Sequence, residues 1–204
     1  MRITLIRHAE SQANIREDLI GGYQPNIPLT KKWIHQAKLL GERLYKEGYL
    51  RTTDGGVHFS PAVRTKETKR IALEILWDHR IAENSELRIR ELGQWDWENK
   101  KRVEIYTTEM QKILNDSAWS YRPPNGESQI DVGNRMLEWL NSLPKNAHSL
   151  AFSHGMAINC LVQRLIWLPS WTAHHHELSN TGITELKYKN HWWSLIRYND
   201  HSHL

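Results

Sequence analysis

The chain has 204 residues, one cysteine and a formal net charge of +4. A single cysteine excludes an internal disulfide framework and fits a reducing compartment, and no apolar run approaches the roughly 18 residues that span a bilayer. The lysines and arginines are scattered, so the charge suits an anionic ligand and does not indicate nucleic-acid binding. Because Met1 leads directly into an apolar segment, we expect no signal peptide and a cytoplasmic protein. We also expect one domain over residues 1–204, no membrane partner, and either a monomer or a homodimer.

The N-terminal part of the chain predicts a strand followed by two helices. Residues 2–6 are apolar and rich in β-branched side chains, which favours a strand. Residues 11–19 predict a first helix. Thr30 is placed as the N-cap of a second helix that runs to about residue 46 and stops at Gly48. The apolar face of that helix consists of Ile34, Ala37, Leu40 and Leu44.

The next segments continue the alternation of strand and helix. Residues 57–60 predict a short strand. Pro61 fits the first position of a helix that continues to about Trp77, with Ser60 as its cap. Residues 86–89 predict a further strand, which leads into Glu91.

The C-terminal half predicts two more helices, a core strand and a hairpin. Residues 127–143 and 156–167 have helical patterns, and residues 149–153 form an apolar strand between them. Residues 183–188 and 192–198 predict the two strands of a hairpin. Strands that alternate with helices indicate an α/β fold: a three-layer sandwich with a mostly parallel sheet flanked by helices and one antiparallel edge.

Charged and imidazole side chains follow several predicted strands at their C-terminal ends. In an open α/β sheet these ends meet at one edge, where ligands bind. Arginines there can hold the charge of a phosphoryl group, one imidazole can attack phosphorus, and a carboxylate can protonate the leaving oxygen. The sequence therefore predicts a phosphoryl-transfer site built from Arg7, His8, Arg64, Glu91 and His154.

These motifs, in this order, resemble those of the histidine phosphatase superfamily, in the branch that includes cofactor-dependent phosphoglycerate mutases. The first motif is Leu-Ile-Arg-His-Ala-Glu-Ser-Gln-Ala-Asn at residues 5–14. The later ones include Ser60-Pro61 with Arg64, Glu91 with Gly93, Pro-Asn-Gly-Glu-Ser at residues 124–128, Ser153-His154-Gly155, and Asn180-Thr181. The resemblance covers essentially the whole chain.

The resemblance implies a role for each matching residue. His8 would be the nucleophile that becomes phosphohistidine, and Glu91 would protonate the leaving group and then activate water. His8 would have to be neutral at its attacking nitrogen, whereas His154 would be protonated when a dianion is bound. Neither a metal nor another cofactor is implied, because arginines supply the positive charge. The residues that would bind the phosphate are Arg7, Asn14, Arg64 and His154.

Departures from the family pattern favour hydrolysis over mutase chemistry. Glu91 is followed by Leu-Gly-Gln, where the mutases have Arg-His-Tyr, and the chain lacks the extra length of the mutases. Ala9 follows the first histidine, as in some phosphatase branches. We expect a small phosphorylated metabolite as substrate. The alternatives are a phosphoprotein substrate, phosphoglycerate mutase activity, and a non-catalytic protein that binds a phosphorylated ligand.

The sequence patterns do not determine the secondary structure of some segments. Residues 94–124 fit the alternation least well, and we expect a small helical or loop lid there. This lid and the loops at residues 20–28 and 170–180 would set substrate specificity. His174, His175 and His176 lack partners at recognisable metal-ligand spacing, so we expect a polar loop at the rim of the pocket and no metal site.

Overall fold

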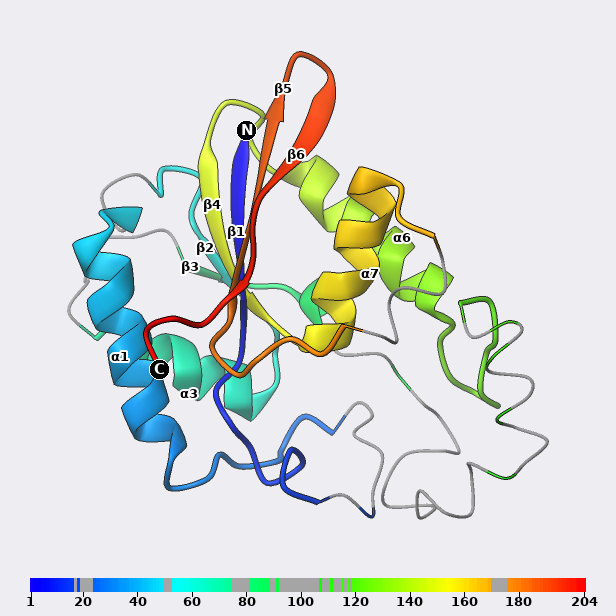
Figure 1. Cartoon of the computed structure of the whole chain (residues 1–204), viewed down its shortest axis with the longest axis horizontal. Helices are drawn as coiled ribbons and strands as arrows, with labels where there is room; N and C mark the ends of the chain where they lie inside the picture. Colours follow the sequence, from blue (N-terminus) through cyan, green and yellow to red (C-terminus); the bar gives the residue numbers. More distant parts are fainter. Residues whose placement is uncertain are drawn as a thin grey trace.

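The computed structural model describes residues 1–16, 18, 24–49, 53–74, 81–88, 91, 107, 111, 115, 117, 119–169 and 176–204. Within these residues a six-stranded sheet has the order β3-β2-β4-β1-β5-β6 (Figure 1). The strands are β1 (Arg2–Arg7), β2 (Val57–Phe59), β3 (Ile81–Glu83), β4 (His148–Ser153), β5 (Ile183–Lys189) and β6 (Trp192–Asp200).

The sheet is mixed, with a parallel part and an antiparallel edge. The β3–β2, β2–β4 and β4–β1 pairs are parallel. Strand β5 pairs antiparallel with β1, and β6 pairs antiparallel with β5, so the hairpin forms an antiparallel edge, as the sequence predicts. Its turn residues Asn190 and His191 have φ values of 52° and 69°, which is the left-handed geometry of tight hairpin turns.

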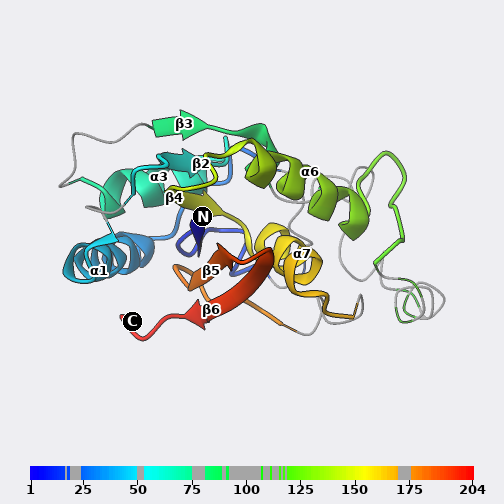
Figure 2. The same cartoon turned by 90° about the horizontal axis from the view of Figure 1, so that it is seen from above.

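Helices cover both faces of the sheet, which confirms the three-layer sandwich. Figure 2 shows α1 (Trp33–Lys46) and α3 (Val63–Ala72) on one side and α6 (Gln129–Ser142) and α7 (Gly155–Ile166) on the other. A 3-10 helix, η1 (Ser85–Leu87), follows β3. No helix in the described part of the chain is long and apolar enough to cross a membrane.

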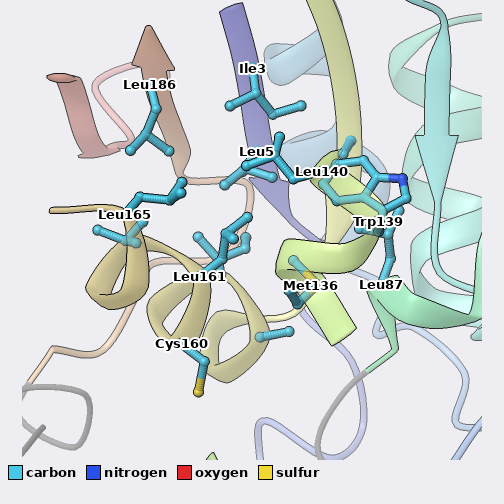
Figure 3. Close-up of a cluster of buried hydrophobic side chains, with 14 of the residues drawn as sticks. Ile3, Leu5, Leu87, Met136, Trp139, Leu140, Cys160, Leu161, Leu165 and Leu186 are labelled. Carbon is cyan, nitrogen blue, oxygen red and sulfur yellow. The ribbon is translucent and has the colours of Figure 1, made fainter. Parts of the chain in front are cut away.

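Each layer has its own core because successive side chains of β1 point to opposite faces. Ile3 and Leu5 pack with α6 and α7 in one cluster (Figure 3). Ile6 packs with α1 and α3 in the other. Cys160 is fully buried in the first cluster, so it acts as a small apolar side chain.

The helix starts differ from the sequence prediction. Residues 11–16 form turns and a bridge from Ser11 to Leu29, not the predicted helix. Thr30 is not an N-cap: its hydroxyl donates to Glu10 Oε1 at 2.7 Å, and α1 begins at Trp33. Ile34, predicted on the buried face of this helix, is 43% exposed. Gly48, with φ of 71°, ends the helix as predicted.

Two further boundaries are corrected. Helix α3 begins at Val63 after an N-cap at Ala62, so neither Pro61 nor Ser60 has its predicted position, and the helix ends at Ala72. The predicted strand at residues 86–89 is wrong: η1 overlaps it, and the strand precedes it as β3.

The C-terminal helices agree with the sequence. Ser128 caps α6 through a capping box with Asp131, which satisfies two free amides of its first turn. Helix α7 ends at Ile166 and is followed by Trp167 as C-cap, with a left-handed φ of 57°. Most of the predicted lid at residues 94–124 lies outside the described residues.

The contact between α1 and α3 gives a first prediction. A Cβ atom on Gly41 would lie 2.6 Å from the carbonyl oxygen of Ala72, so Gly41→Ala forces the two helices apart. We expect the free energy of unfolding to fall by about 1–3 kcal/mol, despite the better helix propensity of alanine. Lys38→Ala, at an exposed position of the same helix, is the control for thermal and urea unfolding. Equal stability of both variants would contradict the close packing.

Candidate active site

His8 lies directly after β1, and its imidazole is held in one tautomer. Its backbone amide donates to the carbonyl of Ser153 at 3.0 Å, which continues the β1–β4 pairing. Its Nδ1 lies 2.7 Å from the carbonyl oxygen of Ala9. A carbonyl only accepts, so Nδ1 carries the proton and Nε2 has the free lone pair. The side chain is 4% exposed.

His154 lies beside His8 because their strands are neighbours. In the parallel β1–β4 register Arg7 is opposite Ser153, so the two histidines follow at the same edge of the sheet. Their ring centroids are 5.1 Å apart. Nε2 of His154 lies 2.8 Å from Ser60 Oγ, which follows β2. Its Nδ1 is buried and has no hydrogen-bond partner within the described residues.

Two arginines, Arg7 and Arg64, complete a four-residue group with His8 and His154. Arg7 donates through Nη1 to the carbonyl of Leu178, while its buried Nε has no hydrogen-bond partner in the described part of the chain. Arg64, in the first turn of α3, is 2% exposed and donates through Nη1 to the carbonyl of Gln24 at 2.6 Å. The structure thus brings together the two arginines and two histidines that the sequence singles out.

Burial and the two arginines determine the charge of the imidazoles. Burial, and then the positive charges of Arg64 and Arg7, hold the pKa of His8 well below its ordinary value. Burial is also the main reason why the pKa of His154 is well below its ordinary value, and Arg64 and His8 follow as causes. Both histidines are therefore neutral at neutral pH. Protonation of His154 would require a bound anion.

Glu91 is held in a separate network of ion pairs. Its Oε1 accepts a hydrogen bond from Arg88 Nε at 2.8 Å, and its carboxylate is 39% exposed. Its backbone amide donates to Glu127 Oε2 at 3.0 Å, and the amide of Glu127 donates back to the carbonyl of Glu91 at 2.8 Å. Arg135 binds the Glu127 carboxylate through two nitrogens. The carboxylate of Glu91 thus contacts Arg88 and not the four-residue group.

Asn14 has a structural contact that the sequence does not reveal. Its Oδ1 accepts hydrogen bonds at 2.9 Å from both the amide and the hydroxyl of Ser11, so it closes the turn that follows His8. Asn180 Nδ2 donates to the carbonyl of His8 at 3.0 Å and approaches Asn14 Oδ1 at 3.4 Å. That Asn14 donates a hydrogen bond to a bound phosphate remains a prediction.

Several residues that support the site have no role in the sequence prediction. Thr68 Oγ1 accepts from the amide of Ala9 at 2.9 Å. The amide of Thr181, a residue with φ of 58°, donates to the carbonyl of Arg7 at 3.1 Å. Ser60 contacts His154 instead of capping a helix. Ser60 and Thr181 lie within the quoted motifs, which are their only signal in the sequence, and Thr68 lies one turn after Arg64 on α3.

The histidine-rich segment shows no metal site where it can be described. His174 and His175 lie outside the described residues. His176 is exposed, and its carbonyl accepts from Asn159 Nδ2 at 2.5 Å. Within the described ranges, no group of three or more histidine, cysteine, aspartate or glutamate side chains could hold a metal ion.

The fold and the sequence assign the chain to a family. Residues 3–201 match the model of the histidine phosphatase superfamily (branch 1). The chain therefore belongs to the histidine phosphatase superfamily, and within it to branch 1. This confirms the family that the motifs indicate.

Relatives and solved structures carry the names of mutases and phosphatases. The chain is 30% identical over 200 residues to proteins of Proteus mirabilis and Serratia proteamaculans named probable phosphoglycerate mutase GpmB, covering 95% of this chain and 87% of each relative. A phosphoserine phosphatase of Entamoeba histolytica superposes with a TM-score of 0.82 at 21% identity, covering 100% of this chain and 98% of that one. A putative alpha-ribazole-5'-P phosphatase of Escherichia coli gives 0.79 at 23% identity, covering 98% and 97%. Together they support phosphatase or mutase activity.

The buried histidines predict how stability depends on pH. A histidine with a depressed pKa in the folded state contributes stability at pH values above its unfolded pKa, and that stability is lost as the pH falls toward the folded value. We expect His154→Asn to reduce the slope of unfolding free energy against pH by up to about 1.4 kcal/mol per pH unit between pH 6 and 5. Urea unfolding in buffers free of phosphate and sulfate measures the slope. An unchanged slope would contradict a neutral buried His154.

Proposed function

We propose that the protein is a metal-independent phosphomonoesterase that acts on a small phosphorylated metabolite through phospho-His8. The observation that carries this proposal is the hydrogen bond from His8 Nδ1 to the carbonyl of Ala9. It leaves the Nε2 lone pair free in the same site as two buried nitrogens that have no hydrogen-bond partner among the described residues, Arg7 Nε and His154 Nδ1. Such an arrangement suits a nucleophile next to a binding site for a dianion.

Binding of the phosphoryl group would give both nitrogens a hydrogen-bond partner, His154 Nδ1 when it carries a proton. Arg7 and Arg64 are almost fully buried in proximity to both histidines, and arginine binds phosphate through directed, charge-assisted hydrogen bonds. A bound dianion also opposes the positive charges that depress the pKa of His154. His154 would then donate to the phosphoryl group, and Asn14 would add a donor from the turn.

The reaction that we propose has two steps, and it requires Glu91, whose carboxylate contacts Arg88 in this structure, to reach the leaving group and carry a proton. The lone pair of His8 Nε2 attacks phosphorus, the bond from phosphorus to the ester oxygen breaks, and that oxygen leaves with the electron pair and a proton from Glu91. Water then attacks the phosphohistidine and gives a proton to the Glu91 carboxylate. The nitrogen–phosphorus bond breaks, and inorganic phosphate and free His8 result. The exposed side chain of Glu91 has access to solvent for this exchange.

The substrate class is inferred from the solved neighbours. Their names include phosphoserine phosphatase, alpha-ribazole-5'-P phosphatase and glucosyl-3-phosphoglycerate phosphatase, and all of these substrates are small monoesters. A phosphoprotein phosphatase is the alternative within the same chemistry.

Mutase activity is the second candidate, favoured by the names of the curated relatives. A mutase returns the phosphoryl group from the histidine to an alcohol instead of water. The two activities are separated by incubation with 3-phosphoglycerate: a phosphatase releases inorganic phosphate, and a mutase forms 2-phosphoglycerate. A protein that only binds a phosphorylated ligand would release no phosphate and form no 2-phosphoglycerate. The presence of all four residues of the group disfavours that alternative.

The His8→Ala variant tests the nucleophile. We expect phosphate release from a panel of monoesters to survive EDTA in the wild type and to fall at least about a thousandfold in the variant, because the covalent route is lost. His35→Ala, at an exposed position on α1, controls for the loss of an imidazole. Undiminished turnover in His8→Ala would refute the mechanism.

The Glu91→Gln variant tests the proton donor. For an alkyl phosphate we expect single-turnover phosphorylation of His8 to slow by about 10²–10⁴-fold. For a nitrophenyl phosphate, whose leaving group needs no proton, the loss should be much smaller. Equal losses for both substrates would show that Glu91 acts through structure alone.

A further inference from the structure

In the described part of the chain, the imidazole of His154 has one hydrogen-bond partner, the hydroxyl of Ser60. Ser60 Oγ and His154 Nε2 are 2.8 Å apart, and both residues are fully buried. The opposite ring nitrogen, Nδ1, is the one without a partner in that part of the chain. The contact with Ser60 therefore determines which edge of the imidazole remains available to a ligand.

The position of Ser60 is itself fixed. Its amide donates to the carbonyl of Phe152 at 3.0 Å, which extends the β2–β4 pairing by one residue. Its carbonyl accepts from Thr65 Oγ1 at 2.8 Å. The hydroxyl itself also accepts from the amide of Ala62 at 3.4 Å, so both the backbone and the side chain of Ser60 are held at the end of the strand.

A hydroxyl can serve His154 in both of its protonation states. It can donate to the lone pair of Nε2 when the imidazole is neutral, and it can accept from Nε2–H when the imidazole is protonated. A carbonyl or an ammonium group in the same place could do only one of these. The contact therefore tolerates a change of charge on His154 without a change of ring orientation.

The surroundings of His154 favour the neutral state until an anion arrives. The charged or titratable groups that act on it are Arg64, His8, Arg135 and Arg7, and all of them oppose its protonation. A dianion bound among the arginines would reverse this balance. The proton would then come from solvent to Nε2, while Nδ1–H donates to the anion.

We propose that Ser60 is a positioning residue that keeps Nδ1 of His154 directed at the phosphoryl group and couples dianion binding to uptake of a proton by His154. This inference deepens the proposed function and rests on it for the identity of the ligand. It assigns Ser60 a role in the protonation cycle of the site.

The test is calorimetric titration with sulfate, which is a dianion at every pH used, so that any proton taken up goes to the protein. Titrations between pH 6 and 8, in two buffers with different ionisation enthalpies, count the protons. We expect the wild type to take up a proton on binding. We expect Ser60→Ala to bind sulfate about tenfold more weakly, the effect of losing a hydrogen bond to a charged group, and to lose most of the uptake.

Two variants control for structural effects. Ser60→Thr retains the hydroxyl and should restore proton uptake. Ser153→Ala removes a similarly buried hydroxyl, which donates to the carbonyl of Leu87 at 2.6 Å, and should leave proton uptake unchanged. Unaltered uptake and affinity in Ser60→Ala would overturn the proposal.

A measurement on the wild type alone avoids dependence on folding of the variants. Nitrogen NMR of labelled histidine should show Nε2 of His154 gaining a proton when sulfate saturates the site; a ring that stays neutral would overturn the coupling.

The experiments distinguish failure of the proposed function from failure of the role of Ser60. Proton uptake without hydrolysis of any monoester would refute the phosphatase and not the role of Ser60. Hydrolysis with unaltered uptake and affinity in Ser60→Ala would refute only that role.

Discussion

The parallel pairing of β1 with β4 is the constraint on which the rest of the site depends. The register places Arg7 opposite Ser153, and each strand then continues into a histidine at the same edge of the sheet. The amide of His8 donates across to the carbonyl of Ser153, so the backbone pairing extends to the histidine itself. Because both strands are buried on both faces, a shift of register would disrupt the packing in both cores and separate the imidazoles.

Carbonyl groups compensate for the concentration of positive charge at that edge. Arg7 donates to the carbonyl of Leu178, and Arg64 donates to that of Gln24. These bonds replace part of the lost hydration without neutralising the guanidinium groups. Glu177 lies 3.8 Å from Arg7 Nη1 but its side chain is 91% exposed, so it offsets only part of this charge. Burial first, and then the positive charge, keeps the pKa of both imidazoles low, so that they remain neutral. The hydrogen bonds that hold the two arginines in place thus also keep their positive charge in the site, where it can bind an anion.

The sequence predicts those parts of the fold that have a regular apolar pattern. Strands β1 and β4, helices α6 and α7 and the hairpin agree with it, as does the grouping of His8 with His154. The errors at Thr30 and Ser60 have a related physical cause: each hydroxyl bonds to a partner distant in sequence, Glu10 or His154, and Ser60 Oγ accepts in addition from the amide of Ala62, before the first residue of α3. Strand β3 is a short strand at the edge of the sheet, defined by its pairing with β2, and the sequence pattern places the strand instead at residues 86–89. The contact of Glu91 with Arg88 also depends on tertiary structure and is not visible in a motif.

The central claim is that the phosphoryl group is transferred to His8 Nε2, and the most direct measurement is to trap it there. The protein would be mixed with a phosphomonoester that it turns over, quenched in alkali within milliseconds, and mapped by peptide mass spectrometry. The account predicts a phosphohistidine in the peptide that contains His8, which disappears when the substrate is exhausted. Turnover with no phosphorylated histidine at any time point, or with the phosphoryl group on His154 instead, would contradict it.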